Sequence, residues 1–402
     1  MASSQIPLCD LDYGPEEEAA VLRVLRSKWL SMGPEVQAFE AEVSDFLGAK
    51  HALAVSSGTA ALHLAYMALG IGPGDEVIQP AINFVAAANI TVAVGATPVF
   101  ADIISLDEPT IDPDSVERVV SPRTKAIVVM HYGGYPGKLA ELTALCARHG
   151  LALVEDACHA IGARYLDADQ RRPHGAQSGT AGDVGCYSFF SNKNMAMGEG
   201  GLVVTSRDDV AERMRRLRSH GMTTLTWDRD RGHAVGYDVV AHGHNYRLDE
   251  LHAALGRCQL RKLPGNNARR LGLVQIYRRA LSALDGWSVP FSHHRGESAC
   301  HLSVAVAPNT STRDLARAHL RSSGIQTSLH YPCVPGFEAF SRFAGEGLEK
   351  SQAFASRAIT LPLFPTMTAD QVEEICRQLT VAVGAEAPRG SDGFPSRIPA
   401  RR

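Results

Sequence analysis

The sequence predicts an α/β fold built on a mostly parallel sheet, as the order and character of its apolar runs indicate. Between about residues 50 and 206, short runs rich in Val, Ile and Ala alternate with amphipathic stretches such as ALHLAYMALG and GKLAELTALCARHG. The runs show no clear in/out alternation, which is typical of strands buried on both faces and joined by helices. The predicted strands are residues 51–56, 76–80, 97–103, 125–132, 151–156, 184–190 and 201–206.

The pattern becomes mainly helical after about residue 250. ELHAALGRCQLRKL continues into LVQIYRRALSAL, and a short strand at 301–307 precedes a helix, TRDLARAHLRSSG. We therefore predict a large α/β domain over residues 14–250 and a small α+β domain over 251–386, which residues 1–13 could join. The tail at 387–402 is rich in Pro, Gly and Arg, so we expect it to be disordered.

Composition indicates an ordinary globular protein. Of the 402 residues, 45% are hydrophobic and 21% charged, and the net charge of −3 gives no electrostatic reason to expect a nucleic-acid or membrane partner. The basic run at 213–218 is predicted to be the solvated face of a helix. The eight cysteines form no C-x-x-C pair, and the first residues lack the features of a secretory signal. We therefore expect reduced thiols and a cytoplasmic location.

A strand runs into Ser57-Gly58-Thr59 and then into an apolar helix. Such a junction presents free backbone N–H groups and the positive end of a helix dipole, which suits a phosphate. The alternative is a plain N-cap, in which Ser or Thr only begins the helix.

A second candidate is the carboxylate pair that closes an apolar strand in LVEDACHA. Glu155 or Asp156 could bind a ligand or a metal, or form a salt bridge. A more specific use is to hold a pyridinium nitrogen protonated, so that the ring accepts electrons. His159 follows three residues later, close enough to lie beside the same ring.

The third candidate is Lys193, in the segment YSFFSNKNMAMGEGG. Lysine is costly to enclose unless its charge is paired or its pKa is lowered, and a lowered pKa is what imine formation needs. The alternative is an exposed loop lysine. Ser188, five residues earlier, could add a hydroxyl to the phosphate site.

The fourth candidate is the polar pair Asn245 and Arg247, which precedes an amphipathic helix. These residues could simply cap that helix. In an assembled dimer they could instead point at a neighbour's phosphate.

Together these segments resemble the DegT/DnrJ/EryC1/StrS family of sugar aminotransferases, which are fold-type-I, pyridoxal-phosphate-dependent homodimers. The resemblance runs from about Leu8 to Leu379. Its motifs are specific in order and spacing: SKWLSMGPEVQAFE, SSGTAALHLA, PAINFVAAANI, EDACHAIGA, SFFSNKNMAMGEGG, GHNYRLDELHAALG, HYP at 330–332 and LPLFPTMT.

The resemblance implies catalytic roles for three residues. Lys193 would hold pyridoxal 5'-phosphate as a Schiff base and then move the proton between the substrate and cofactor carbons. Asp156 would pair with the pyridine nitrogen, and His159 would lie near the phenolic edge of the ring. Phe84, in the INFVA segment, would stack on the ring face.

The resemblance also implies a phosphate site shared between two subunits. Gly58 and Thr59, with Ser57 beside them, and Ser188 would hold the phosphate in one subunit. Asn245 of the other subunit would join them, with Arg247 nearby. The partners implied are a second copy of the chain, a keto-sugar and an amino-acid donor.

Two departures from the family pattern concern the substrate and the reaction. Many relatives have a second histidine a few residues after HYP, whereas this chain has CVPGF, with Pro335 or Gly336 at that place. The sugar or its carrier is therefore expected to differ from the common cases. A branch of the family replaces the lysine with histidine and performs dehydration, which the presence of Lys193 disfavours.

The function predicted is transfer of an amino group, with L-glutamate as the expected donor, to a keto group of a nucleotide-linked deoxysugar. One alternative acceptor is a keto-cyclitol of the inosose type in natural-product biosynthesis. A different class is a regulatory protein that binds the cofactor without turnover. No metal site is expected, since the 16 histidines form no H-E-x-x-H motif and the pair at 293–294 lies in a predicted surface loop.

Overall fold

The computed structural model describes residues 6–165, 175–224, 236–294 and 296–384. Its main feature is a sheet of seven strands in the order β1-β7-β6-β5-β4-β2-β3. Strands β2 to β6 pair in parallel, whereas β7 runs antiparallel to both of its neighbours. The mostly parallel sheet and all seven predicted strands are confirmed, with bounds β1 His51–Val55, β2 Glu76–Pro80, β3 Thr97–Ala101, β4 Thr124–Met130, β5 Ala152–Asp156, β6 Val184–Ser188 and β7 Gly201–Thr205.

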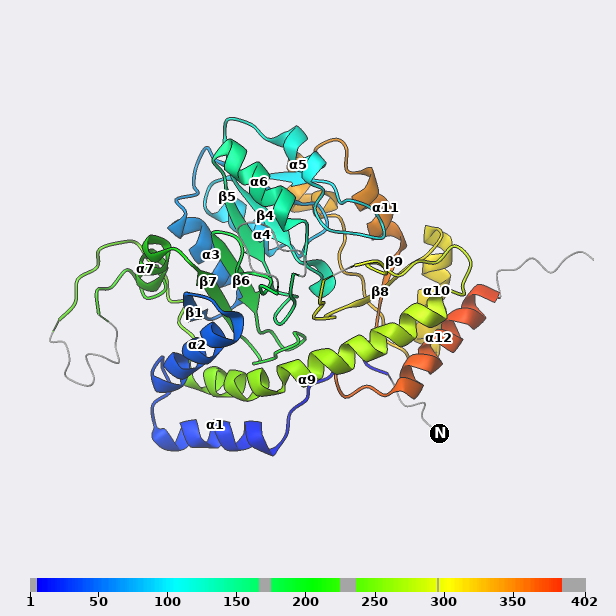
Figure 1. Cartoon of the computed structure of the whole chain (residues 1–402), viewed down its shortest axis with the longest axis horizontal. Coiled ribbons are helices and arrows are strands. Elements are labelled where there is room, and N and C mark those ends of the chain that lie inside the picture. The colour runs from blue at the N-terminus through cyan, green and yellow to red at the C-terminus, as the bar shows by residue number, and fades with distance from the viewer. Residues whose placement is uncertain (1–5, 166–174, 225–235, 295, 385–402) are drawn as a thin grey trace, which may run out of the picture.

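Helices cover both faces of this sheet (Figure 1). Helices α3, α4 and α7 pack over one face, where they meet alternate strand residues such as Val128 and Val154. Helices α5 and α6 pack over the intervening residues, such as Val129 and Leu153, and α2 covers the same face at β1. This double burial explains the continuous apolar runs. The bounds are α2 Pro34–Leu47, α3 Gly58–Ala68, α4 Ala86–Ala93, α5 Pro113–Val119, α6 Leu139–His149 and α7 Asp208–Leu217.

A smaller antiparallel pair, β8 and β9, lies with α10, α11 and α12 at the other end of the molecule (Figure 1). On one face of this pair, Ala305, Ile359 and Leu361 form a separate core cluster with the C-terminal half of α9. The predicted strand at 301–307 is β8, while β9 was not predicted. The bounds are β8 Ser303–Val306, α10 Thr310–Ser322, α11 Glu349–Arg357, β9 Ala358–Leu361 and α12 Ala369–Gly384.

Helix α9, Glu250–Leu281, runs from beneath the large sheet to α12 (Figure 1). Its N-cap is Asp249, whose side chain accepts the His252 N–H at 2.9 Å. Helix α1, Pro15–Ser27, lies along its outer side. The predicted domain boundary at residue 250 coincides with the start of α9, and the division into two domains stays a prediction.

The prediction for the basic run at 213–218 was partly wrong. Arg215 and Arg216 form ion pairs with Glu212 on the exposed side of α7, as a solvated face requires. Arg218 is instead only 3% exposed. It forms an ion pair with Glu40 and donates to the Ala54 carbonyl at 2.7 Å, so it ties β1 to the end of α7.

Two further expectations concern the chain ends and membranes. The predicted disordered tail, 387–402, lies outside the described residues. No helix in the described ranges is both long enough and apolar enough to cross a bilayer.

Candidate active site

Three strand ends meet at one edge of the large sheet. Met130, Asp156 and Ser188 are the last residues of β4, β5 and β6. Side chains two positions apart in a strand share a face, and the residues two positions earlier pack under α3: Val128, Val154 and Cys186. The three end residues therefore lie on the α3 side, where they line a cavity of about 270 Å³. Parallel sheets bind their ligands at this edge.

Glu155 and Asp156, which the sequence left as equivalent candidates, lie on opposite faces of β5. Asp156 lines the cavity, where the Cys158 N–H donates to its carboxylate at 3.2 Å. Glu155 is fully buried on the other face and accepts backbone N–H groups of Gly179 and Ala181, at 2.8 and 2.6 Å. Glu155 thus holds the turn before β6, and only Asp156 is available to a ligand.

The β1–α3 junction forms one corner of the cavity. The Ser57 side chain is the N-cap, since its Oγ accepts the Ala60 N–H at 3.1 Å. Gly58 packs so closely that an added Cβ would lie 2.8 Å from Ser188 Cβ and 3.1 Å from Cys158 Sγ. Thr59 is exposed at the same helix start. The N-cap and the phosphate interpretations are therefore compatible, because the first turn also carries N–H groups with no partner inside the helix.

Lys193 lies in the loop between β6 and β7, and its side chain lines the cavity together with Asp156. Its backbone N–H donates to the Phe190 carbonyl at 2.8 Å, which closes a tight turn. Burial lowers the pKa of the Lys193 amine, while Cys158 and Asp156 act in the opposite direction. The exposed-loop alternative is therefore wrong: this lysine is enclosed beside a carboxylate.

His159 and the HYP segment form the inner wall. His159 is 3% exposed, and its Nε2 lies 2.9 Å from Tyr331 Oη. Burial, with Lys193 and two other histidines nearby, holds the pKa of His159 well below its usual value, so the ring is neutral. His330 also lines the cavity, and burial beside Lys193 lowers its pKa to about 4. The HYP segment, for which the sequence predicted no role, thus supplies two wall residues, His330 and Tyr331.

Phe84 lies at the mouth of the cavity. It follows β2 and is 53% exposed, with its ring centroid 5.8 Å from that of Tyr331. An exposed aromatic side chain beside a cavity offers an apolar platform for a planar ring.

Asn245 and Arg247 do not line this cavity. Asn245 is exposed. Arg247 Nη1 donates to Ser219 Oγ at 3.0 Å, and its backbone bridges to Val55. The single chain therefore does not bring these two predicted residues to its own site.

Other cavity residues were not predicted, notably Cys158, Phe190, Asn192 and Glu199. All four stand within the EDACHAIGA and SFFSNKNMAMGEGG segments. The motifs therefore located the cavity in the sequence. They did not show which side chains point into it, because in the second motif this depends on the turn from Phe190 to Lys193.

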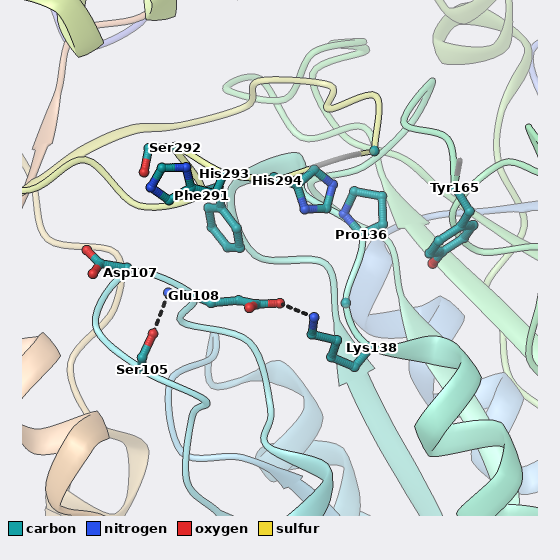
Figure 2. Close-up of a pocket in the computed structure, with 12 residues that line it drawn as sticks. Ser105, Asp107, Glu108, Pro136, Lys138, Tyr165, Phe291, Ser292, His293 and His294 are labelled. Carbon is teal, nitrogen blue, oxygen red and sulfur yellow. Dashed lines mark hydrogen bonds and ion pairs between the residues drawn. The ribbon is translucent and has the colours of Figure 1, made fainter. Parts of the chain in front are cut away.

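A second cavity, of about 340 Å³, shares no lining residue with the first (Figure 2). Lys138 Nζ lies 3.3 Å from Glu108 Oε1, and the Glu108 N–H donates to Ser105 Oγ at 3.0 Å. His293 and His294 lie on its rim (Figure 2). None of the residues predicted for chemistry lines it, so the cavity around Lys193 is the candidate active site.

The residues at the first cavity fit pyridoxal 5'-phosphate. The cavity holds the Lys193 amine, whose pKa is lowered, and the Asp156 carboxylate. At the start of α3, Gly58 packs closely against Ser188. In addition, His159 Nδ1 is buried without a hydrogen-bond partner among the described residues, as a group awaiting a ligand would be.

Comparison with known proteins gives a consistent result. Residues 12–380 match the sequence model of the DegT/DnrJ/EryC1/StrS aminotransferase family. The spore coat polysaccharide biosynthesis protein SpsC of Bacillus subtilis strain 168 is 38% identical over 372 residues, which are 90% of this chain and 93% of SpsC.

Solved structures agree over nearly the full length. PseC of Helicobacter pylori, an aminotransferase involved in the biosynthesis of pseudoaminic acid, superposes with a TM-score of 0.87 at 29% identity, covering 95% of this chain and 100% of PseC. DesV of S. venezuelae, solved in complex with a ketimine intermediate, gives a TM-score of 0.84 at 35% identity, covering 94% of this chain and 98% of DesV.

Proposed function

The chain belongs to the DegT/DnrJ/EryC1/StrS aminotransferase family, and on that premise we propose that it moves an amino group from L-glutamate to a keto group of a nucleotide-linked deoxysugar. The enzyme is an aminotransferase that depends on pyridoxal 5'-phosphate. The donor, the sugar and its nucleotide carrier are our proposal. The observation that carries it is the enclosure of Lys193 and Asp156 in one cavity within a chain of this family.

The cofactor, when bound, supplies an aldehyde that condenses with amines and a ring that accepts the electron pair of a broken C–H bond. Asp156 would face the pyridine nitrogen, because a carboxylate there keeps that nitrogen protonated. The exposed face of Phe84 would pack against the ring. Gly58, Thr59 and Ser188 would hold the phosphate at the start of α3, with Ser57 serving as the helix cap.

Lys193 Nζ would carry the proton. Burial lowers the pKa of this amine, so a larger fraction is unprotonated and able to act as a base. Once released from the cofactor, the Lys193 amine would take the proton from the substrate carbon and deliver it to the cofactor carbon. Neutral His159 leaves the wall without a second positive charge, which would compete with Lys193 for nearby anions.

We further propose that the active site is completed in a homodimer. Asn245 is exposed and lies outside the cavity of its own chain, as expected for a side chain that reaches the phosphate of a second copy. Arg247 would stay in its own chain through Ser219 and line the shared edge. The cytoplasmic location stays a prediction.

The acceptor class rests on what the relatives do. SpsC takes part in polysaccharide biosynthesis, and PseC in the biosynthesis of pseudoaminic acid. These names favour a sugar over a keto-cyclitol as the acceptor. The nucleotide carrier is proposed without a sequence motif of its own.

The first test is the visible absorbance spectrum of the purified protein before and after L-glutamate. A yellow protein that loses its colour with glutamate, and regains it with a nucleotide-linked keto-deoxysugar, supports the whole proposal. Recovery with a keto-inosose alone would assign the cyclitol alternative. A protein that binds the cofactor but never loses colour with any amino acid would identify the regulatory alternative.

A further inference from the structure

The residue that follows the catalytic lysine candidate is a buried amide with three hydrogen bonds. Asn194 is 6% exposed. Its Nδ2 donates to Asn267 Oδ1 on α9 at 2.8 Å and to the Ala299 carbonyl at 2.6 Å. Its Oδ1 lies 3.0 Å from His301 Nδ1. The loop that carries Lys193 is therefore attached both to α9 and to the segment before β8.

The orientation of this amide is fixed by groups that cannot donate. A backbone carbonyl only accepts, so the NH₂ of Asn194 must face Ala299. Asn267 is fixed in the same way, because its Nδ2 donates to the Ile161 carbonyl at 3.1 Å and its Oδ1 is left for Asn194. Hence the oxygen of Asn194 faces His301, and His301 Nδ1 must carry the proton.

A second proton on His301 is disfavoured by its surroundings. The ring is 5% exposed, and its Nε2 has no hydrogen-bond partner within the described ranges. Burial holds the pKa of His301 well below its usual value, and the positive charges of Lys193 and Arg270 act in the same direction, as does His330. His301 is therefore a neutral imidazole with a bare Nε2.

This ring lies directly behind the inner wall of the active site. The His301 and His159 centroids are 4.2 Å apart with the planes tilted by 43°. His301 does not line the cavity, so it would act on the reaction only through its neighbours. A charged ring at this distance would oppose the positive charge of Lys193 and disturb His159.

We propose that Asn194 and His301 are positioning residues for the amino-transfer reaction: Asn194 fixes the loop that presents Lys193 and holds His301 as the neutral Nδ1–H tautomer behind His159. The consequence of this arrangement is that neither His159 nor His301 adds a positive charge beside Lys193. This inference rests on the proposed role of Lys193.

The tautomer can be measured directly. Histidine ring nitrogens of ¹⁵N-histidine-labelled holoenzyme give NMR shifts that separate the two neutral tautomers and the imidazolium. The His301 signals are those lost in His301→Gln. We expect a protonated Nδ1 and a bare Nε2 that do not titrate between about pH 5 and 8, where an ordinary histidine changes charge. An imidazolium, or a proton on Nε2, would overturn the inference even if Lys193 holds the cofactor.

Kinetics separate positioning from simple packing. Glutamine at position 301 can still donate an N–H to Asn194 Oδ1, whereas leucine cannot. We expect His301→Leu to lower kcat about tenfold, the value of roughly one hydrogen bond, with KM for the keto substrate unchanged, and His301→Gln to recover most of the loss. The matched controls are His319→Leu and His319→Gln on α10, because His319 Nε2 lies 2.8 Å from Gln378 Oε1 and the residue does not line the cavity.

The outcomes distinguish this inference from the proposed function. Equal losses in the Gln and Leu variants of His301 would refute a positioning role for the N–H. If wild-type protein shows the predicted tautomer but Lys193 holds no cofactor, the proposed function fails while the geometry of Asn194 and His301 stands.

Discussion

Gly58 and Ser188 approach so closely that a methyl group on the Gly58 Cα would lie 2.8 Å from Ser188 Cβ. The two residues come from the start of α3 and the end of β6. Their contact brings a serine hydroxyl to the end of a helix where backbone N–H groups are free. The packing of these two elements therefore builds the corner that we assign to the phosphate.

Gly58→Ala is accordingly expected to weaken cofactor binding. The added carbon would meet Ser188 Cβ, which cannot rotate away because it is bonded directly to the backbone. Helix α3 must therefore shift away from Ser188, at a cost of about 1–3 kcal/mol. If the whole cost falls on binding, the Kd for pyridoxal 5'-phosphate should rise about 5- to 150-fold, measured by absorbance titration of the cofactor-free protein. Gly272→Ala is the control, since a Cβ there meets nothing within 4 Å and sits in α9. A Gly58→Ala protein with unchanged Kd would place the phosphate elsewhere.

Lys193→Ala is expected to abolish covalent attachment of the cofactor and essentially all turnover. The direct measurement is the mass of the protein after borohydride reduction, which makes an existing lysine linkage permanent. Lys138→Ala is the matched control, because Lys138 lines the other cavity and pairs with Glu108. Cofactor mass retained on the Lys193→Ala protein would assign the attachment to another lysine.

The fold was predictable from the sequence because each strand of the large sheet is an isolated apolar run. The run at 201–206 gave no sign that β7 is antiparallel, since strand direction depends on the connection and not on composition. Strand β9, Ala358–Leu361, was missed because four residues that directly follow α11 are too few to show a period of two. Its identity as a strand comes from pairing with β8, far away in the chain.

The candidate site was predictable to the level of motifs but not of side-chain direction. Glu155 and Asp156 are adjacent in sequence, and only the register of β5 shows which one faces α3. The role of Asn194 could not be inferred because its partners, Asn267 and Ala299, are 73 and 105 residues away. Buried polar contacts of this kind follow from the fold and leave no local pattern.

Asp156→Asn should leave the cofactor bound but lower kcat severely. The amide keeps the size of the side chain and loses the charge that would keep the ring nitrogen protonated, so electron withdrawal weakens. We expect a fall of roughly 100-fold or more, similar to the loss of other groups that stabilise charge in a transition state. Absorbance gives the bound cofactor and single-turnover kinetics give the rate. Near-normal turnover would show that Asp156 is not the partner of the ring.

Glu155→Gln should destabilise the fold instead of slowing the reaction selectively. Burial opposes ionisation of Glu155, but the His131 side chain and the N–H groups of Gly182 and Gly179 lower its pKa overall. Replacing this carboxylate with an amide leaves some of these buried donors without an acceptor. We expect the free energy of unfolding, measured with urea, to fall by about 3 kcal/mol. Glu117→Gln, on an exposed ion pair with Arg148, should change stability by less than about 1 kcal/mol.

The lowered pKa of Glu155 also fixes how the stability of the protein depends on pH. The pKa of Glu155 is lower in the folded than in the unfolded chain, where it is about 4.3. The stabilisation is therefore complete above that value and is lost as the pH falls through the folded pKa. Wild-type protein should lose stability more steeply than Glu155→Gln on acidification below about pH 4.3. Parallel curves would mean that Glu155 is not ionised in the folded protein.

The shared site predicts rescue between two inactive variants. Asn245→Ala removes the side chain that we assign to the neighbour's phosphate, and Lys193→Ala removes the amine within its own cavity. In a hybrid dimer, the cavity of the Asn245→Ala chain keeps Lys193 and receives an intact Asn245 from its partner, so one complete site forms. Co-expression with two different tags and purification through both should therefore give a dimer that regains activity and the yellow colour.

The control pair is Lys193→Ala with Asp156→Asn: both changes lie in the cavity of one chain, so every hybrid site stays defective. Activity in the first hybrid, with no more than the residual activity of Asp156→Asn in the second, would locate Asn245 across the interface, because exchange of subunits can restore only a site built from both chains.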